Sequence, residues 1–218
     1  KQRVSLTDEG LEILTRCFSG KQFSFKGKRY SIRDVVIKPN YVQPGGPPLW
    51  VAASSVAGAR RAAHFDAHLL PQGPFDTTIQ AWRDELKNTG LSPDDYRIGI
   101  IKPCFVTDDK EFEWPRVREA ERQRMQYYRR AFEVAGRSAP PDQDRERISQ
   151  NWVVGDVNHC VDELTDFIRE NGITDLVTWA VPPGLRPVDM APSLEKFATQ
   201  VAPMLKAGLF ILLSLIHI

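Results

Sequence analysis

The beginning of the chain carries apolar residues at helical spacing. Leu11, Leu14 and Phe18 recur three and four positions apart among polar neighbours. This period predicts an amphipathic helix over roughly residues 6 to 19. Ser5 and Thr7 precede an acidic turn and are candidate N-caps, because their hydroxyls can accept from a first-turn N–H.

A different pattern follows this helix. Residues 23–25 and 30–32 alternate apolar and polar positions on either side of a Lys-Gly-Lys turn, which predicts a small β-hairpin. A stretch rich in Pro and Gly over residues 39–48 then interrupts regular structure.

Short apolar runs alternate with helical patterns along the rest of the chain. Apolar runs without alternation are typical of parallel strands that are covered on both faces. Strands are expected at residues 49–53, 67–70, 97–106 and 173–181, helices at 56–63, 75–88, 109–136, 157–171 and from residue 193, and a Pro-rich loop at 138–144. The repeat of strand and helix predicts an α/β fold.

Four such units are about half of a (β/α)8 barrel, which needs eight strands. An open half-barrel leaves two strand edges unpaired. The chain is therefore either a complete small α/β sheet or the C-terminal half or more of a (β/α)8 TIM barrel with its N-terminal strands missing. Its first residue, Lys1, is not Met, which favours the second interpretation.

Composition narrows the function classes. The 218 residues are 42% hydrophobic and 26% charged, which excludes disorder and coiled coil. With 29 Lys+Arg and 28 Asp+Glu the net charge is +1, so bulk charge gives no reason to bind nucleic acid or an anionic membrane. Cys17, Cys104 and Cys160 lie far apart in sequence. We therefore expect no metal site and a reducing, cytoplasmic location.

The C-terminal tail differs in composition from the rest of the chain. Residues 209–216 form the most apolar run of the chain, but it is shorter than the ~20 residues that span a bilayer. We expect one domain over residues 3–206 and a non-native tail over residues 207–218, whose ending resembles translated sequencing adapter. The alternatives are a short buried strand or an oligomer contact.

The best candidate for a binding site in the sequence lies where the strand expected at residues 49–53 is followed by the next helix. Ser54 and Ser55 place hydroxyl and N–H groups at that helix N-terminus, which favours an anion such as a phosphate. The simpler interpretation is a plain N-cap. His68 lies in the next predicted strand and is a candidate for the same site, with a structural role as the alternative.

Several short stretches of the sequence, each of them a weak indicator of a family alone, are informative when they are taken together in the order in which they occur. They are TDEGLEIL at residues 7–14, FSFKGKRY at 23–30, the Lys-Pro to Pro-Pro-Leu-Trp-Val stretch at 38–51, VGD at 154–156, GITDLV at 172–177 and SLEKFA at 193–198. Together they resemble the bacterial luciferase-like, flavin-dependent monooxygenase family, and the resemblance covers nearly all of residues 3–206.

This resemblance implies a (β/α)8 barrel that binds reduced FMN, or coenzyme F420 in sister groups, at the C-terminal mouth of the strands. In that family the segment matching residues 51–57 helps to hold the cofactor phosphate. The cofactor-binding residues it implies here are Val51, Ala53, Ser54, Ser55 and Ala57. The catalytic residues stay unassigned and are expected upstream of Lys1.

The resemblance also implies an activity. We expect a monooxygenase that uses reduced FMN and O2 to oxygenate a small organic substrate, and we expect residues 1–218 alone to be inactive. The alternatives are an F420-dependent oxidoreductase that transfers hydride, and a non-catalytic flavin-binding homologue or subunit. The expected partners are the substrate, the flavin and a flavin reductase, with a homodimer as the candidate assembly.

Overall fold

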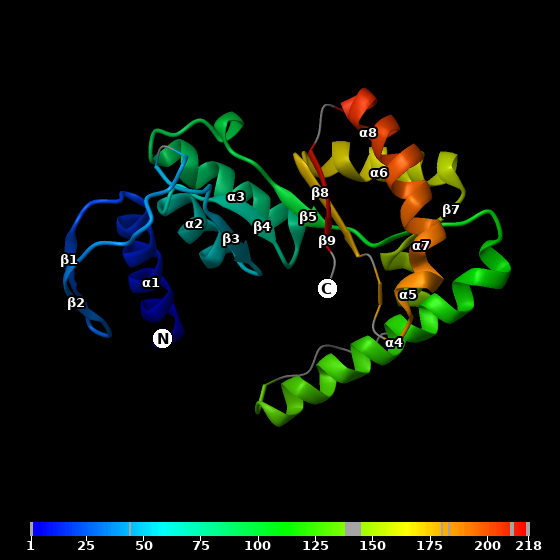
Figure 1. Ribbon diagram of the computed structural model, residues 1–218, viewed down its shortest axis with the longest axis horizontal. Helices are drawn as coiled ribbons and strands as arrows, with labels where there is room; N and C mark the ends of the chain where they lie inside the picture. The colour runs from blue at the N-terminus through cyan, green and yellow to red at the C-terminus, as the bar shows by residue number, and fades with distance from the viewer. Residues whose placement is uncertain are drawn as a thin grey trace. The chain divides into compact units, whose positions relative to one another are not determined.

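The computed structural model of the chain describes residues 2–43, 45–137, 145–179, 181–182, 184–209 and 212–216. The chain divides into unit 1, Lys1–Arg97, and unit 2, Ile98–Ile218, and Figure 1 labels most of the helices and strands of both. The predicted loop over residues 138–144 falls outside the described ranges. No helix within those ranges is both long and apolar enough to cross a membrane.

Helix α1 of unit 1 spans Gln2–Phe18 and begins earlier than the sequence predicts. Ser5 and Thr7 both lie inside this helix, and the Thr7 hydroxyl donates to the Arg3 carbonyl oxygen at 2.9 Å, so the prediction of Ser5 and Thr7 as N-caps is wrong. The residues before Thr7 include good helix formers that continue the helix in the N-terminal direction. None of the described side chains of α1 is buried.

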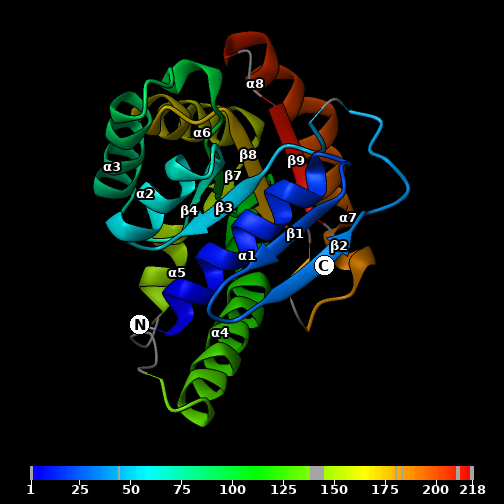
Figure 2. The ribbon, with the colours of Figure 1, turned by 90° about the vertical axis from the view of Figure 1, so that its left-hand side faces the viewer.

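The predicted hairpin is confirmed. Strands β1 (Phe23–Lys26) and β2 (Ser31–Val35) pair in antiparallel fashion, with Phe25 opposite Ile32. Phe25 is the buried residue of this hairpin, and Figure 2 shows both strands alongside α1. The hairpin and α1 therefore form one substructure within unit 1.

The first two βα repeats are also confirmed. Strands β3 (Trp50–Ala53) and β4 (His68–Pro71) are parallel, and each is followed by a helix, α2 (Val56–His64) after β3 and α3 (Phe75–Asn88) after β4. The residues that these helices bury are Ala59, Ala62 and Ala63 in α2 and Thr78, Ile79, Ala81, Trp82 and Leu86 in α3. The 3-10 turn η1 (Pro93–Asp95) follows them.

In unit 2 the single strand predicted over residues 97–106 is two strands that pair with different partners. Strand β5 (Gly99–Ile101) lies parallel to β8 (Asp175–Trp179), whereas β6 (Cys104–Val106) lies parallel to β7 (Val153–Gly155). Pro103, between β5 and β6, has no N–H to donate. The ladder of hydrogen bonds between β5 and β8 therefore ends there.

The helices of unit 2 match the predicted pattern with three differences. They are α4 (Lys110–Val134), α5 (Arg145–Asn151), α6 (Val157–Asn171), α7 (Pro187–Lys196), the π-helical turn η2 (Phe197–Val201) and α8 (Ala202–Leu209). Helix α5 was not predicted, α7 begins before residue 193, and the last helix contains a π-turn. Helix α6 has the predicted bounds and ends at Gly172, whose φ of 61° is left-handed as a C-terminal cap requires.

An aromatic cluster forms the core beside β6 and β7. Its buried members are Phe105, Trp114, Val117, Ile148, Trp152, Val154 and Met190. The Trp114 and Trp152 ring centroids lie 5.3 Å apart, within the range of favourable aromatic contacts. These side chains come from strands and helices that are distant in sequence and join α4, α5 and α7 to β6 and β7.

Residues of the C-terminal tail add a strand to the sheet of unit 2. Strand β9 (Leu212–Ile216) lies parallel to β8, and the sheet order is β5-β8-β9. The domain boundary at residue 206 and the non-native origin of residues 207–218 stay predictions. Among the described residues the strands form short separate sheets and no closed barrel, so the mixed α/β architecture is confirmed and the complete barrel is not seen.

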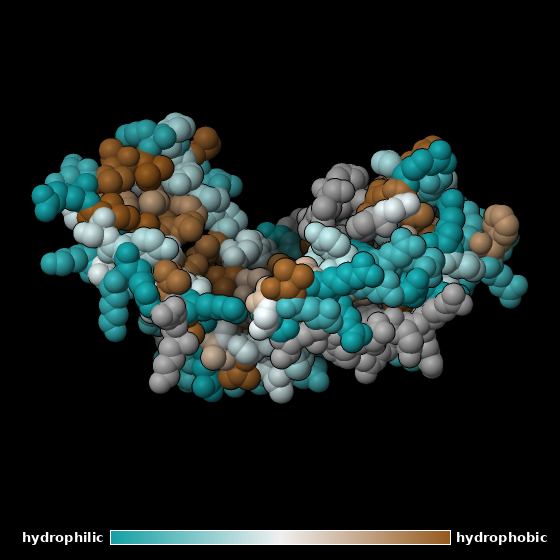
Figure 3. Space-filling view, turned by 90° about the horizontal axis from the view of Figure 1, so that it is seen from below, coloured by the Kyte–Doolittle hydropathy of each residue, from teal (hydrophilic) through white to brown (hydrophobic). Residues whose placement is uncertain are grey.

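Several large apolar side chains are exposed. They include Val4, Leu14, Tyr30, Val36 and Val42 in unit 1 and Phe112, Tyr127, Val134 and Val188 in unit 2. Figure 3 shows brown apolar patches among the teal polar surface on the face that it draws. Val4 and Leu14 belong to α1, in which none of the described side chains is buried.

Candidate functional site

The candidate site lies at the carboxyl ends of β3 and β4. These strands are parallel with Ala53 opposite Pro71, so both end at the same edge of the sheet. The Gln72 N–H donates to the Ala53 carbonyl oxygen at 2.7 Å and ties the turn after β4 to the turn after β3. The N-termini of α2 and α3 therefore follow neighbouring, connected turns.

Ser55 is the N-cap of α2. Its hydroxyl oxygen accepts a hydrogen bond from the Gly58 N–H at 3.2 Å, and its extended backbone is that of an N-cap. The simpler interpretation of Ser55 is therefore confirmed. A hydroxyl that accepts one hydrogen bond keeps its own proton to donate, so capping the helix leaves Ser55 able to bind an anion.

The remaining groups of this turn face outward. Ser54, Val56 and Ala57 are exposed. In the part of the chain that the structure describes, the N–H groups of Val56 and Ala57 have no acceptor, as expected for the first turn of a helix. These N–H groups and the two serine hydroxyls can together stabilise a negative group at the positive end of α2.

Val51 and Ala53 are placed differently from the serines. Ala53 is buried, and its Cβ would lie 3.2 Å from a Cβ built on Gly58 of α2. Val51 precedes Ala53 by two residues and shares its face of the strand. The contribution of Ala53 is therefore to hold the turn, through its carbonyl and its packing, and the proximity of Val51 to a ligand stays a prediction.

Gly73 belongs to the same turn pair and was not singled out from the sequence. A Cβ on Gly73 would lie 2.9 Å from the Ser54 carbonyl oxygen, closer than atoms can approach without a shift. The loop after β4 can therefore lie against Ser54 only because this residue has no side chain. The Gln-Gly-Pro sequence after the strand was the available signal.

His68 lies at the other end of β4. It is the first residue of that strand and pairs with Trp50, its Nδ1 accepts from the Arg97 N–H at 3.1 Å, and its ring centroid is 4.8 Å from that of Trp50. The interpretation of His68 as part of the carboxyl-end site is wrong, because the strand starts at this residue. The structural role that the sequence left open is the correct one.

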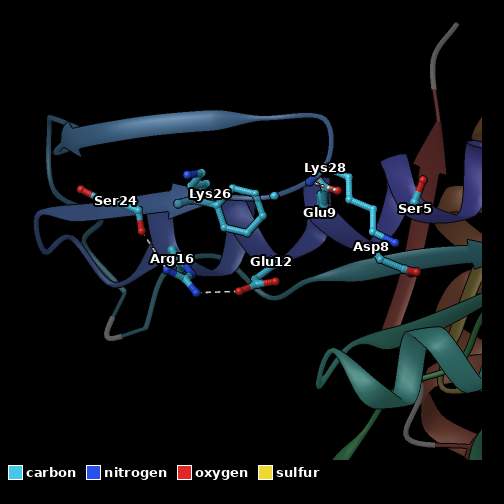
Figure 4. Close-up of a pocket in the computed structure, with 10 residues that line it drawn as sticks. Ser5, Asp8, Glu9, Glu12, Arg16, Ser24, Lys26 and Lys28 are labelled. Atoms are coloured by element: carbon cyan, nitrogen blue, oxygen red, sulfur yellow. Dashed lines mark hydrogen bonds and ion pairs between the residues drawn. The ribbon is translucent and has the colours of Figure 1, made fainter.

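A hollow of about 390 Å³ lies between α1 and the hairpin, and Figure 4 shows the charged side chains that line it. The Glu9 carboxylate accepts from the N–H groups of Lys28, Arg29 and Tyr30 at 2.9–3.1 Å. Burial alone would raise the pKa of Glu9, but these hydrogen bonds and the Arg29 charge lower it.

The other acidic residues of this hollow are also paired. Glu12 forms an ion pair with Arg16 at 2.6 Å, and Asp8 forms one with Arg61 of α2. These carboxylates hold α1, the hairpin and α2 together, so the hollow is explained as a structural joint. Across the described residues no three His, Cys, Asp or Glu side chains gather as metal ligands would.

Comparisons with known proteins point to one family. The sequence model of the family described as Luciferase-like monooxygenase matches residues 1–175. An uncharacterized protein, y4vJ, from Sinorhizobium fredii is 23% identical over 180 residues, which are 75% of this chain and 51% of that protein.

Solved structures agree on the fold. The monooxygenase RslO1 from Streptomyces bottropensis superposes with a TM-score of 0.67 at 21% identity, over 90% of this chain and 60% of that one. The F420-dependent tetrahydromethanopterin reductase from Methanopyrus kandleri gives a TM-score of 0.69 at 15% identity, over 93% and 63%.

A third structure was solved with a flavin. The oxygenating constituent of 3,6-diketocamphane monooxygenase from Pseudomonas putida, in complex with FMN, gives 0.64 at 21% identity, over 95% and 63%. The chain thus spans about half the length of the curated relative and about 60% of the solved structures.

Proposed function

The chain belongs to the luciferase-like monooxygenase family, and from that premise we propose that its protein is a flavin-dependent monooxygenase that uses reduced FMN and O2 to oxygenate a small organic substrate. The observation that carries the proposal is the match over residues 1–175, which includes the exposed turn after β3. A flavin reductase as supplier of reduced FMN, a homodimer and a cytoplasmic location are part of the same proposal.

The turn after β3 fits the phosphate of such a cofactor. The Ser54 hydroxyl is exposed, the Ser55 hydroxyl has a proton to donate, and the N–H groups of Val56 and Ala57 are without acceptors in the described structure. Together they offer four donors at the positive end of α2, which is the chemistry that a phosphate dianion requires.

The roles of these residues are binding and orientation. The donors at the turn would hold the phosphate, while the bond from Gln72 to Ala53 and the close packing of Gly73 keep the turn in one conformation. Bound reduced FMN would supply the electrons for oxygenation by O2. The residues that position the substrate and exclude water are not assigned.

F420-dependent hydride transfer is the second candidate function. F420-dependent enzymes are among the solved structures of the same fold, including a secondary alcohol dehydrogenase that superposes with a TM-score of 0.67 at 17% identity. F420 also carries a phosphate, so the donors of the turn after β3 do not discriminate between FMN and F420. We favour FMN because the matching family is described as monooxygenase.

Cofactor titration tests this proposal. The purified protein is titrated with FMN, riboflavin and F420, and binding is followed by fluorescence. Replacing Ser54 by Ala removes a hydrogen bond to a charged group, worth about 1.5–3 kcal/mol. The Kd for FMN should therefore rise roughly ten- to a hundred-fold while that for riboflavin stays unchanged.

The matched control is Ser92→Ala, since Ser92 is an exposed serine at an N-cap position without a side-chain hydrogen bond. It should leave all three affinities unchanged. An equal loss of FMN and riboflavin in Ser54→Ala contradicts the phosphate assignment. Binding of F420 without FMN selects the second candidate, and binding of neither cofactor rejects both.

A further inference from the structure

The side chain of Gln72 lies at the carboxyl end of β4, beside the turn that carries the proposed phosphate donors. Gln72 directly follows the last residue of β4, and its backbone N–H donates to the Ala53 carbonyl oxygen at 2.7 Å. This bond continues the parallel ladder in which Ala53 lies opposite Pro71. The backbone of Gln72 is therefore tied to the residue that precedes Ser54.

The pleat of the strand determines the direction in which Gln72 projects. Side chains two residues apart share a face of a strand, so Gln72 shares the face of Leu70, and Pro71 lies on the other face. Pro71 is buried, as is Ala53, which lies opposite it and next to α2. Leu70 is only half-buried, and Ala52 opposite it is exposed. Gln72 therefore extends from the less covered face of the two strands.

The carboxamide of Gln72 is only partly used by the protein. Gln72 is exposed, and its Nε2 donates to the Pro71 carbonyl oxygen at 3.2 Å. In the part of the chain that the structure describes, no donor contacts its Oε1. Since a carboxamide carries two N–H donors and one acceptor oxygen, Gln72 keeps one donor and the acceptor for a ligand.

The part of FMN next to its phosphate matches this carboxamide. In FMN a chain of hydroxyl groups joins the phosphate to the ring, and a hydroxyl both donates and accepts a hydrogen bond. A phosphate at the N-terminus of α2 brings these hydroxyls to the neighbouring turn, because Gly73 lets the turn after β4 lie against Ser54. Gln72 is also neutral and so does not repel the phosphate, as a carboxylate there would.

We propose that Gln72 is a cofactor-binding residue whose carboxamide hydrogen-bonds the hydroxyl chain of FMN. This inference rests on the proposed function, since it takes FMN as the ligand of the turn after β3. Ser54 and Gln72 then recognise different parts of one ligand, Ser54 the phosphate and Gln72 the chain between phosphate and ring. The two adjacent turns together orient the cofactor at the carboxyl ends of β3 and β4.

Three flavins separate the contributions of phosphate, hydroxyl chain and ring. Riboflavin lacks the phosphate of FMN, and lumiflavin lacks both the phosphate and the hydroxyl chain. The full chain and its Gln72→Ala variant are titrated with each flavin, and binding is followed by flavin fluorescence. Loss of a neutral hydrogen bond should raise the Kd for FMN and for riboflavin by the same factor, roughly three- to ten-fold. The Kd for lumiflavin should stay unchanged.

Two further variants test whether the effect belongs to the carboxamide. Gln72→Met keeps the length of the side chain without its polar atoms, and it should give the same pattern as Gln72→Ala. Gln80→Ala is the matched control, because Gln80 is an exposed glutamine of α3 that bonds to Asp84 of the same helix. It should leave the Kd for every flavin unchanged.

The outcomes distinguish this inference from the function on which it rests. If the Gln72 variants bind FMN and riboflavin as tightly as the unmodified chain, the inference is overturned while the proposed function stands. An equal loss of affinity for lumiflavin also overturns it, since lumiflavin has no hydroxyl chain. If the unmodified chain binds none of the three flavins, the proposed function and this inference are both rejected.

Discussion

The packing of Gly73 against Ser54 leads to a quantitative prediction for Gly73→Ala. The new Cβ would lie 2.9 Å from the Ser54 carbonyl oxygen, 3.2 Å from its carbonyl carbon and 3.3 Å from its Cα. All three are backbone atoms, so no side-chain rotation can relieve the contact. Ordinary contact begins at 3.4 Å, and the two turns must therefore separate by about 0.5 Å.

This separation affects both stability and binding. Overpacking of this kind costs about 1–3 kcal/mol, and it strains the hydrogen bond from the Gln72 N–H to the Ala53 carbonyl oxygen, which is 2.7 Å long. Urea unfolding followed by circular dichroism should show that loss in the free energy of unfolding. Because Ser54 moves, the affinity for FMN should fall more than the affinity for riboflavin.

Gly10→Ala provides the control within unit 1. A Cβ on Gly10 meets nothing within 4 Å, and Ala is favoured over Gly inside a helix by about 0.5–1 kcal/mol. The control should therefore be neutral or stabilising. If Gly73→Ala unfolds at the same urea concentration as the unmodified protein, the close approach of the two turns is not a real constraint.

Two further predictions concern pH. The stabilisation by Glu9 is complete above its unfolded pKa of about 4.3 and is lost as the pH falls through its lower folded pKa. The protection of the Lys28 amide, which is its exchange rate corrected for the intrinsic pH dependence, should therefore fall in acid, and Glu9→Gln should show the reduced protection already at neutral pH. Burial and the Asp66 hydrogen bond raise the pKa of Tyr96 to about 12, so its stabilisation is present below about pH 10 and is lost from there to about 12. Tyr96→Phe should remove that alkaline loss of stability, and an unchanged pH profile would contradict the assignment.

The elements with local signals were predictable from the sequence. Helix α6 was predicted with its observed bounds because its apolar stripe is regular and Gly172 marks its end. Ser55 was identified as a cap because a serine between a strand and a helix has that local use. In both places the physical cause lies within a few residues of its effect.

The features that depend on distant partners were not predictable. The break between β5 and β6 arises because β8 and β7 take different halves of one predicted strand. His68 was assigned to the carboxyl-end site because the strand was short, but it stands near the start of the predicted strand and is the first residue of β4, and its contacts with Trp50 and Arg97 come from residues distant in sequence. Gly73 shows its role only when the turn after β3 lies beside it.

The α1–hairpin substructure also determines where proteases cleave the chain first. It is attached to α2 through the ion pair between Asp8 and Arg61, and within it the Glu9 carboxylate joins α1 to the hairpin, whose buried residue is Phe25. Such attachments release at little cost, while β3, β4 and their helices keep their own buried contacts. Limited digestion should thus trim this N-terminal substructure first and leave a resistant body that begins near Trp50.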